Sequence, residues 1–272
     1  MEPNPIFESR LMGNLFNNYL RKLKHELLGT RVRRYPLPEV PIPDNLIIEY
    51  DSIISKVLPY YIQLSETNKK RFLLRVYNFR KAKQFHFSGI EPNEEITILI
   101  SAAAVQVSFG LKNYQLPFFT DIHILSDAYN ALDSREIYIG HVSPTGIYIS
   151  WKHFVQGFAD YTDGFNVALH EMAHALHHEN FINETGIDWD FRRDFEKLTP
   201  VFGPLVAQAI MQKKSYLRGY AFTNFHEFWA VSVEYFFENP KGLKDNLPQL
   251  YNILVDTLNQ DPLHLDELPA VV

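Results

Sequence analysis

Apolar residues recur with helical spacing over most of the chain, so the pattern predicts a mainly helical protein. Helices are expected at residues 6–29, 94–110, 164–179, 190–213, 225–237 and 247–259, with two more between 51 and 84. The first of these two ends near Leu64, and Ser65 or Thr67 caps the second. Residues 94–110 are apolar nearly throughout, which indicates a buried helix that ends at Gly110.

Strand patterns are confined to the middle of the chain. They occur at residues 121–125, 136–142 and 146–151. Ser143-Pro144-Thr145-Gly146 is a turn sequence between the last two, so these strands should form a hairpin. Helices, then a small sheet, then a further run of helices indicate the α+β class.

A proline-rich segment divides the chain. Residues 31–44 contain four prolines within eight positions, a density that a helix interior or a central strand does not accept. We therefore expect an extended connector. It makes residues 1–50 a helical extension and residues 51–272 the main domain.

Composition narrows the function classes. The chain has 272 residues, 46% of them hydrophobic, with a net charge of −6 and a pI near 6.0, which argues against nucleic acid as the main partner. No cysteine is present, so a metal site must use histidine and carboxylate ligands. The longest near-apolar run, at 96–111, is polar and short beside the ~20 residues of a membrane span. With no signal-peptide pattern at the N-terminus, we expect a cytoplasmic protein without a membrane partner.

The predicted helix that follows residue 65 is strongly basic. A solvated helix face is the ordinary interpretation of such a charge run, and a surface for an acidic partner is the alternative. The cations concerned are Lys69, Lys70, Arg71, Arg75, Arg80, Lys81 and Lys83.

The candidate chemistry lies in the predicted helix at 164–179, for which Asp163 is the expected cap. Residues 170–174 read H-E-M-A-H. On a helix, His170 and His174 share one face, so that two imidazoles can bind one metal ion while Glu171 reaches a metal-bound water. An apolar stripe occupies a different face of the same helix, formed by Phe165, Leu169, Met172 and Leu176. His177 and His178 are expected at the surface.

Catalytic zinc needs a third protein ligand. The candidates by residue type are Glu179, Glu184, Asp188, Asp190, His226, Glu227 and Glu234. Glu227 is preferred, because a carboxylate near the start of an otherwise apolar helix is costly unless it is paired or binds metal. Glu234 is a candidate to orient His170 or His174, with an ordinary ion pair or a surface position as the alternative.

Two long stretches resemble the Mlc titration factor A family of zinc-dependent peptidases. They are D-G-F-N-V-A-L-H-E-M-A-H at 163–174 and G-Y-A-F-T-N-F-H-E-F-W-A-V-S-V-E-Y-F-F at 219–237. T-G-I-Y-I-S-W at 145–151 and Q-D-P-L at 260–263 are similar as well, and the resemblance covers about residues 55–265. The chain departs from that family at His177, where its members often carry Asp.

The resemblance implies a fold, a cofactor and a set of residue roles. That family resembles the catalytic domain of anthrax lethal factor, so the implied fold is a zincin-like metallopeptidase, mostly helical with a small mixed sheet beside the active-site helix. One zinc ion per chain is implied, in a gluzincin-type site. The implied ligands are His170, His174 and Glu227, with Glu171 as general base and Tyr220 as the phenol that stabilises the transition state.

The expected function is hydrolysis of a peptide or protein substrate by a metal-activated water, with the substrate extended along strand 146–151. The main alternative is a zinc-containing regulatory protein that sequesters a transcriptional repressor with little or no proteolysis, as the family name implies. Glu171 favours catalysis, because a structural zinc site needs no base beside its ligand. A di-iron carboxylate site is disfavoured, since its E-x-x-H pattern must occur twice and is found once.

Overall fold

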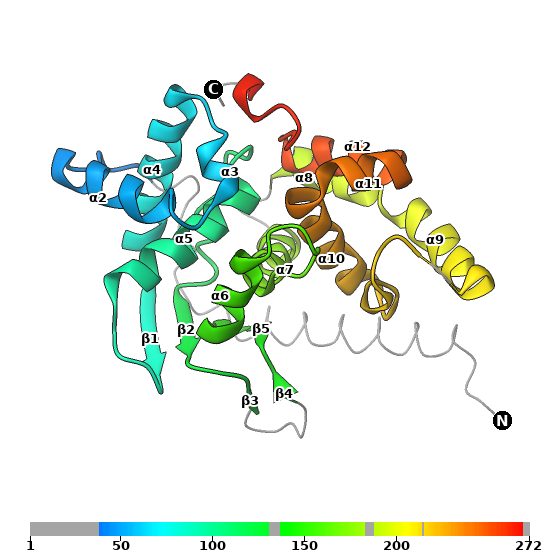
Figure 1. The fold of residues 1–272 in the computed structure, drawn as a ribbon, viewed down its shortest axis with the longest axis horizontal. Coiled ribbons are helices and arrows are strands. Elements are labelled where there is room, and N and C mark those ends of the chain that lie inside the picture. The colour runs from blue at the N-terminus through cyan, green and yellow to red at the C-terminus, as the bar shows by residue number, and fades with distance from the viewer. Residues whose placement is uncertain (1–37, 131–136, 183–187, 214, 269–272) are drawn as a thin grey trace.

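The computed structural model describes residues 38–130, 137–182, 188–213 and 215–268, and within them the chain has the expected α+β architecture (Figure 1). The helix predicted at 6–29 lies outside these ranges, as does the first half of the proline-rich connector. The expected domain division at residue 50 stays a prediction, and helix α2 (Asp44–Ile54) runs through that position. The elements occur in the order α2 (Asp44–Ile54), α3 (Pro59–Ile62), α4 (Glu66–Lys81), β1 (Gln84–Ser88), α5 (Glu94–Ser108), β2 (Asp121–Leu125), β3 (Tyr129–Asn130), β4 (Ile137–Tyr138), β5 (Gly140–Ser143), β6 (Gly146–Ser150), α6 (Trp151–Ala159), α7 (Val167–Ile182), α8 (Trp189–Glu196), α9 (Thr199–Gln212), η1 (Gly219–Phe222), α10 (Phe225–Glu238), α11 (Pro240–Asn246), α12 (Pro248–Leu258) and η2 (Leu265–Glu267).

The main sheet has four strands in the order β1-β2-β6-β5. Strands β1, β2 and β6 are parallel, and β5 runs antiparallel to β6. The predicted hairpin is confirmed, because Ser143 pairs with Gly146 across the turn. Gly146 has φ of +145°, a conformation that side chains rarely accept.

The two faces of the sheet differ in chemistry. Alternate residues of β2 and β6 are buried isoleucines that join the hydrophobic core, and α7 packs against β5 and β6. The opposite face carries a row of rings, one from each strand. His86, His123, Tyr148 and His141 stack in that order, with ring centroids 4.7, 4.1 and 4.2 Å apart.

Helix α7 occupies the centre of the molecule, with α10 beside it (Figure 1). The expected separation into an apolar stripe and a polar face is wrong, because α7 is buried on nearly all sides by α5, α10 and the sheet. Ala168 and Ala173 are as inaccessible as the leucines, and His177 is also buried. Phe165 precedes the helix and is 42% exposed.

The cap of α7 is Asn166, not Asp163. The Oδ1 atom of Asn166 accepts hydrogen bonds from the amides of Ala168 and Leu169 at 3.1 and 3.2 Å. Gly164 explains the later start, because its φ of +71° is left-handed and interrupts a helix. A side chain there would also lie 2.6 Å from the Tyr235 ring.

Two predicted helices are divided by proline. The segment expected as one helix at 190–213 forms α8 and α9, and Pro200 lies in the first turn of α9. Proline fits that position but lacks the amide hydrogen that a continuing α8 would need. Pro59 begins α3 in the same way and separates it from α2. The confirmed boundaries include the Ser65 cap of α4. Elements that the pattern missed are β1, β3, α6, α11 and the short helices η1 and η2.

The expected role of Gly110, ending a helix in a left-handed conformation, is wrong. It lies just beyond the end of α5, and a Cβ atom there would be 2.1 Å from the carbonyl oxygen of Asn259. Close approach of two backbones therefore explains this glycine.

Cations in helix α4 and just after it bind interior backbone groups, so the expected solvated face is wrong for them. Lys83 is 8% exposed, and its ammonium group donates to the carbonyls of Gln115, Leu116 and Phe119 at 2.6–2.7 Å. Arg75, 6% exposed, donates to two carbonyls that follow α5. These charges satisfy backbone oxygens in a region without regular structure.

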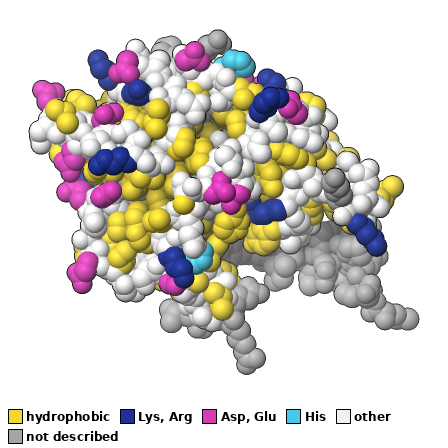
Figure 2. Space-filling view, viewed as in Figure 1, with side chains coloured by type: hydrophobic (Ala, Val, Ile, Leu, Met, Phe, Trp, Pro, Cys, Tyr) yellow, Lys and Arg dark blue, Asp and Glu magenta, His cyan; other side chains and the backbone are white. Residues whose placement is uncertain are grey.

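On the face drawn in Figure 2, basic side chains lie apart from one another and are interspersed with acidic ones. Within the parts of the chain that the structure describes, every helix is too short or too polar to span a lipid bilayer.

Candidate metal centre

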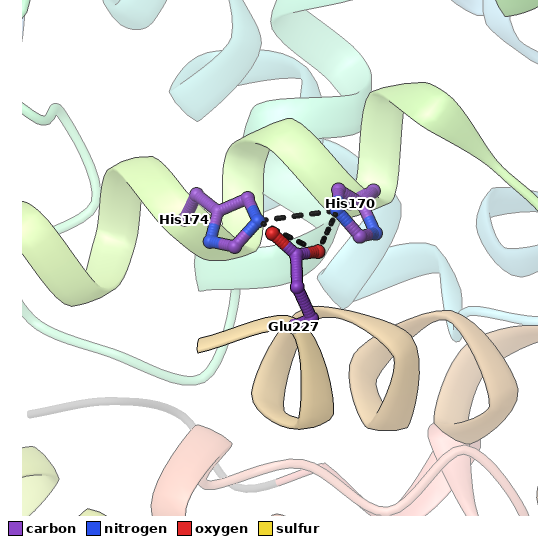
Figure 3. Close-up of side chains that lie close together, drawn as sticks. All are labelled: His170, His174 and Glu227. Carbon is purple, nitrogen blue, oxygen red and sulfur yellow. Dashed lines mark hydrogen bonds and ion pairs between the residues drawn. The ribbon is translucent and has the colours of Figure 1, made fainter. Parts of the chain in front are cut away.

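Helix α7 places two imidazoles side by side. His170 and His174 lie one turn apart, and their Nε2 atoms are 3.1 Å from each other (Figure 3). The backbone of His170 makes the first helical hydrogen bond, to the carbonyl of Asn166. The capping residue therefore determines where in the turn His170 falls.

A carboxylate from helix α10 completes the group. Asn224 caps α10 by accepting from the amides of His226 and Glu227, which places Glu227 in the first turn. The Oε2 atom of Glu227 lies 3.0 Å from Nε2 of His170 and 3.5 Å from Nε2 of His174. The indole of Trp229 donates to the Ala173 carbonyl at 2.8 Å and ties α10 to α7.

These three side chains fit a divalent metal ion. One ligand atom from each of His170, His174 and Glu227 lies within 4.8 Å of the others. Two nitrogens and one oxygen are a donor set that suits zinc and leaves a coordination position open. Beside them, Oε2 of Glu171 is buried and has no hydrogen-bond partner among the described residues. A buried acceptor left in this state fits a group that receives a proton from a reactant.

The carboxylates of the group favour a positive charge among them, which a protonated His170 carries until a metal ion displaces its proton. Before any metal binds, burial alone lowers the pKa of His170, but the charge of Glu234 and the hydrogen bonds to Glu227 and Glu234 outweigh it and raise this pKa to about 10. Burial alone would raise the pKa of Glu227. The hydrogen bonds to His170 and His174 have the larger, opposite effect and leave this pKa below the usual range. The carboxylate is therefore ionised, as a metal ligand must be.

Glu171 lies against strand β5. A Cβ atom on Gly140 would be 2.6 Å from Cγ and 2.7 Å from Oε1 of Glu171, so the backbone of β5 passes directly over the carboxyl group. Glu171 is 5% exposed, and burial raises its pKa to about 8 despite the opposing charge of His170. A carboxylate in such surroundings is a stronger base than an exposed one.

Tyr220 lies at the same site, on the short helix η1. Its ring centroid is 6.1 Å from that of His170, and the side chain is 52% exposed. Burial of the hydroxyl and the charges of Glu227 and Glu171 raise its pKa, so the phenol keeps its proton and can donate a hydrogen bond.

Glu234 is buried behind His170, so the alternative of a surface position is wrong. Its Oε1 atom accepts from Nδ1 of His170 at 2.6 Å, and its Oε2 atom accepts from the Asn166 amide at 2.7 Å. The residue is 1% exposed. Glu234 therefore orients the ring of His170 and leaves Nε2 to face the other ligands.

Arg218 is a site residue that the sequence patterns missed. Its guanidinium Nη2 lies 2.5 Å from Oε1 of Glu234. No periodicity connects the two, since Arg218 precedes η1 and Glu234 is in α10. The one usable signal was that a buried carboxylate needs a cation.

The other candidates for the third ligand have different roles. Glu179 accepts from the Phe118 amide, and Asp188 caps α8 through the Phe191 amide. Asp190 pairs with Arg193. The ring of His226 contacts His177, with centroids 4.9 Å apart. Glu184 lies outside the described ranges.

His177 is not a surface residue. It is 5% exposed, and its ring packs against Phe181 and Phe195 with centroids 4.7 and 4.8 Å away. Burial and the neighbouring His226 hold its pKa well below the usual range, so it is a neutral member of an aromatic cluster. His178 is partly buried beside Phe119.

The expected substrate strand is also wrong. Strand β6 lies between β2 and β5 and uses both of its edges for pairing. Among the described strands β5 pairs with β6 alone, so β5 is the edge strand beside the candidate metal centre.

Fold and site together define a metallopeptidase-type domain. The chain belongs to the glucose-regulated metallopeptidase M90 family, whose profile matches residues 30–258. This membership confirms the family resemblance seen in the sequence and implies a metal ion, for which His170, His174 and Glu227 are the candidate ligands.

Three relatives indicate how far the similarity extends. An uncharacterized protein of Synechocystis is 25% identical over 249 residues, covering 85% of this chain and 89% of that protein. Mlc titration factor A of Yersinia enterocolitica is 25% identical, covering 55% of this chain and 58% of that protein. Mlc titration factor A of Cronobacter sakazakii is 26% identical, covering 58% and 63%. The similarity to the two titration factors thus spans about three-fifths of their length.

Proposed function

We propose that this protein is a zinc-dependent peptidase in which His170, His174 and Glu227 hold the metal and Glu171 is the general base. The observation that carries the proposal is the convergence of three ligand atoms from two helices within 4.8 Å, beside a buried carboxyl oxygen without a partner. The metallopeptidase family supports the same class of reaction.

Held by His170, His174 and Glu227, a zinc ion would supply Lewis-acid chemistry, which would polarise a carbonyl group and lower the pKa of water. Glu171 takes the proton of the attacking water and passes it to the leaving amine. The Tyr220 hydroxyl donates a hydrogen bond to the oxyanion as it forms, since its raised pKa keeps it protonated.

The outer edge of β5 is the proposed platform for substrate. An extended peptide that pairs with Gly140–Ser143 adds a strand to the sheet through backbone hydrogen bonds. Because Gly140 carries no side chain, that peptide also comes close to Glu171. The substrate class is therefore an extended peptide or an unstructured segment of a protein.

The test compares two glutamates of helix α7. Wild-type protein should contain about one zinc per chain, and Glu171→Gln should keep the zinc while losing peptide hydrolysis. Glu179→Gln is the matched control, because Glu179 is also buried but bonds to the Phe118 amide. Full hydrolysis by Glu171→Gln would exclude this mechanism. Glu227→Ala should lose zinc, and unchanged zinc content there would exclude Glu227 as a ligand.

A second candidate function is binding of a transcriptional repressor, and the names of the two titration factors favour it. With a partner of that kind, the proposed location is the cytoplasm. Purified Mlc-type repressor and the Glu171→Gln variant distinguish the two functions. A protein that acts by sequestration binds the repressor equally well with and without Glu171. Absence of binding by either form removes this candidate.

A further inference from the structure

Arg218 connects three segments that surround the metal centre. Its guanidinium donates through Nη1 to the Gly164 carbonyl in the loop before α7, and through Nη2 to Oε1 of Glu234 in α10. It lies over the Phe165 ring, 5.0 Å from the centroid. Its own backbone immediately precedes η1. One side chain thus joins the entrance of α7, the middle of α10 and the η1 turn.

The contact with Glu234 leads directly to a metal ligand. Oε1 of Glu234 accepts from Arg218 and from Nδ1 of His170, while Oε2 accepts from the Asn166 amide. Both carboxylate oxygens are therefore held, and Glu234 is 1% exposed. The Arg218 guanidinium and the His170 ring share one acceptor atom. Displacement of either group therefore moves that atom or removes one of its hydrogen bonds.

Tyr220 is close to Arg218 in the chain. It follows Arg218 by two positions, its side chain is 52% exposed, and its hydroxyl is hydrogen-bonded to Glu227. Its place also depends on the backbone of η1, in which the Ala221 amide donates to the Arg218 carbonyl and Leu217 and Ala221 are buried. Arg218 fixes the first residue of this turn to α10 and to the loop before α7.

We propose that Arg218 is a positioning residue. Through Glu234 it orients the ring of His170, and through its backbone it holds Tyr220 beside that ring. The proposal rests on the function proposed above, in which His170 binds metal and Tyr220 contacts the reacting group. Loss of Arg218 then has two effects, a weaker metal site and a displaced phenol.

The metal effect is measured without any substrate. Zinc affinity is determined by chelator competition, and ligand geometry by the visible spectrum of the Co²⁺-substituted protein. Arg218→Ala should weaken zinc binding about tenfold to hundredfold, the usual cost of removing a group that supports a ligand, and should shift the Co²⁺ bands. Zinc affinity and Co²⁺ spectrum equal to those of the wild type would refute the connection through Glu234.

Arg80→Ala is the matched control for packing and charge. Arg80 is 24% exposed against 23% for Arg218, and it pairs with Glu94 at 2.7 Å in another part of the molecule. It should lose stability while keeping zinc affinity and the Co²⁺ spectrum unchanged. If Arg80→Ala changes both readouts as Arg218→Ala does, general loss of rigidity explains the effect and the proposal fails.

The position of Tyr220 is followed by a fluorine label. With 3-fluorotyrosine at position 220, Arg218→Ala should shift or broaden the ¹⁹F resonance, and Arg80→Ala should leave it as in the wild type. An unmoved resonance in Arg218→Ala refutes this part. Arg218→Lys keeps the charge but loses the forked head, so it should restore zinc affinity in part and the resonance poorly. Circular dichroism confirms that each variant is folded.

Kinetics separate this proposal from the proposed function. Arg218→Ala should lower kcat with little change in KM, and adding Tyr220→Phe should reduce kcat no further than Tyr220→Phe alone, because both remove the same stabilisation. If the two substitutions lower kcat independently, so that their factors multiply, Arg218 does not act through Tyr220 and this part of the proposal fails. If the wild type hydrolyses no peptide, the proposed function fails, and the zinc, Co²⁺ and ¹⁹F measurements still decide the role of Arg218.

Discussion

Nδ1 of His170 lies 2.6 Å from Oε1 of Glu234, so a residue of α10 determines how a residue of α7 presents its other ring nitrogen. The carboxylate accepts, which places the proton on Nδ1 and leaves Nε2 as the donor atom for a metal. The remaining oxygen of Glu234 accepts from the amide of the α7 cap, Asn166. The metal ligand and the start of its helix are thereby held by one buried side chain.

The first prediction concerns Glu234. Glu234→Ala should weaken zinc binding about tenfold to hundredfold, because the His170 ring loses the acceptor that orients it and Arg218 loses its partner. Chelator competition measures the affinity. Asp194→Asn is the control, since Asp194 is also a buried, paired carboxylate but bonds to Arg193 and Lys197. Unchanged affinity in Glu234→Ala would show that His170 is oriented by other means.

The second prediction concerns the contact between β5 and the general base. Gly140→Ala should abolish most peptide hydrolysis while the zinc content stays at the wild-type value, because the new methyl group lies 2.6 Å from Cγ of Glu171 and displaces that side chain. Gly203→Ala is the control, because nothing lies within 4 Å of its added Cβ and alanine favours the helix. Hydrolysis at the wild-type rate in Gly140→Ala would mean that Glu171 can move aside freely.

Local rules sufficed for part of this structure. The i, i+4 spacing of His170 and His174 and the turn sequence before Gly146 act within a few residues, and the structure confirms the shared helix face and the hairpin that they predict. Glu227 could be predicted from the free-energy cost of burial, since a carboxylate in an apolar helix needs a partner. The resemblance to a known family supported that choice and supplied Tyr220.

Features that depend on distant chain segments were missed. The edge position of β5 follows from the order of four strands, which no single strand sequence specifies. His177 is buried by Phe195 of α8, and Arg218 finds its partner in α10. Asn166 caps α7 because Gly164 has a left-handed conformation. A glycine permits this conformation, but its presence in a sequence does not predict it.

The third prediction is a pH dependence of stability that comes from Glu238. This residue is 5% exposed, and burial, opposed by the hydrogen bond from Asn166, raises its pKa from about 4.5 to about 8. Below about pH 4.5 the carboxyl is protonated in both the folded and the unfolded chain, and its stabilising effect is complete. As the pH rises towards 8, the unfolded chain ionises first, so the free energy of unfolding falls. Above about pH 8 no further loss is expected.

Urea denaturation at several pH values measures this effect, with chelator present throughout so that metal release does not contribute. The side chain of the Glu238→Gln variant is neutral in both states. Between pH 5 and pH 8 the free energy of unfolding should therefore fall less in this variant than in the wild type, by on the order of a few kcal/mol. Glu196→Gln, at an exposed position, should follow the wild-type curve. Parallel curves for wild type and Glu238→Gln would place the titration elsewhere.

The last prediction links metal binding to folding. A ligand that binds only the folded chain raises the free energy of unfolding, by about 2.7 kcal/mol when its free concentration is a hundred times Kd. Zinc should therefore raise the unfolding midpoint of the wild-type protein, and chelator should reverse the change. His174→Ala and Glu227→Ala should respond little, because each removes one of three ligand atoms that lie within 4.8 Å. His264→Ala should respond as the wild type does, since His264 is exposed and pairs with Asp261. An equal response to zinc in Glu227→Ala and the wild type would show that the stabilising ion binds at another site.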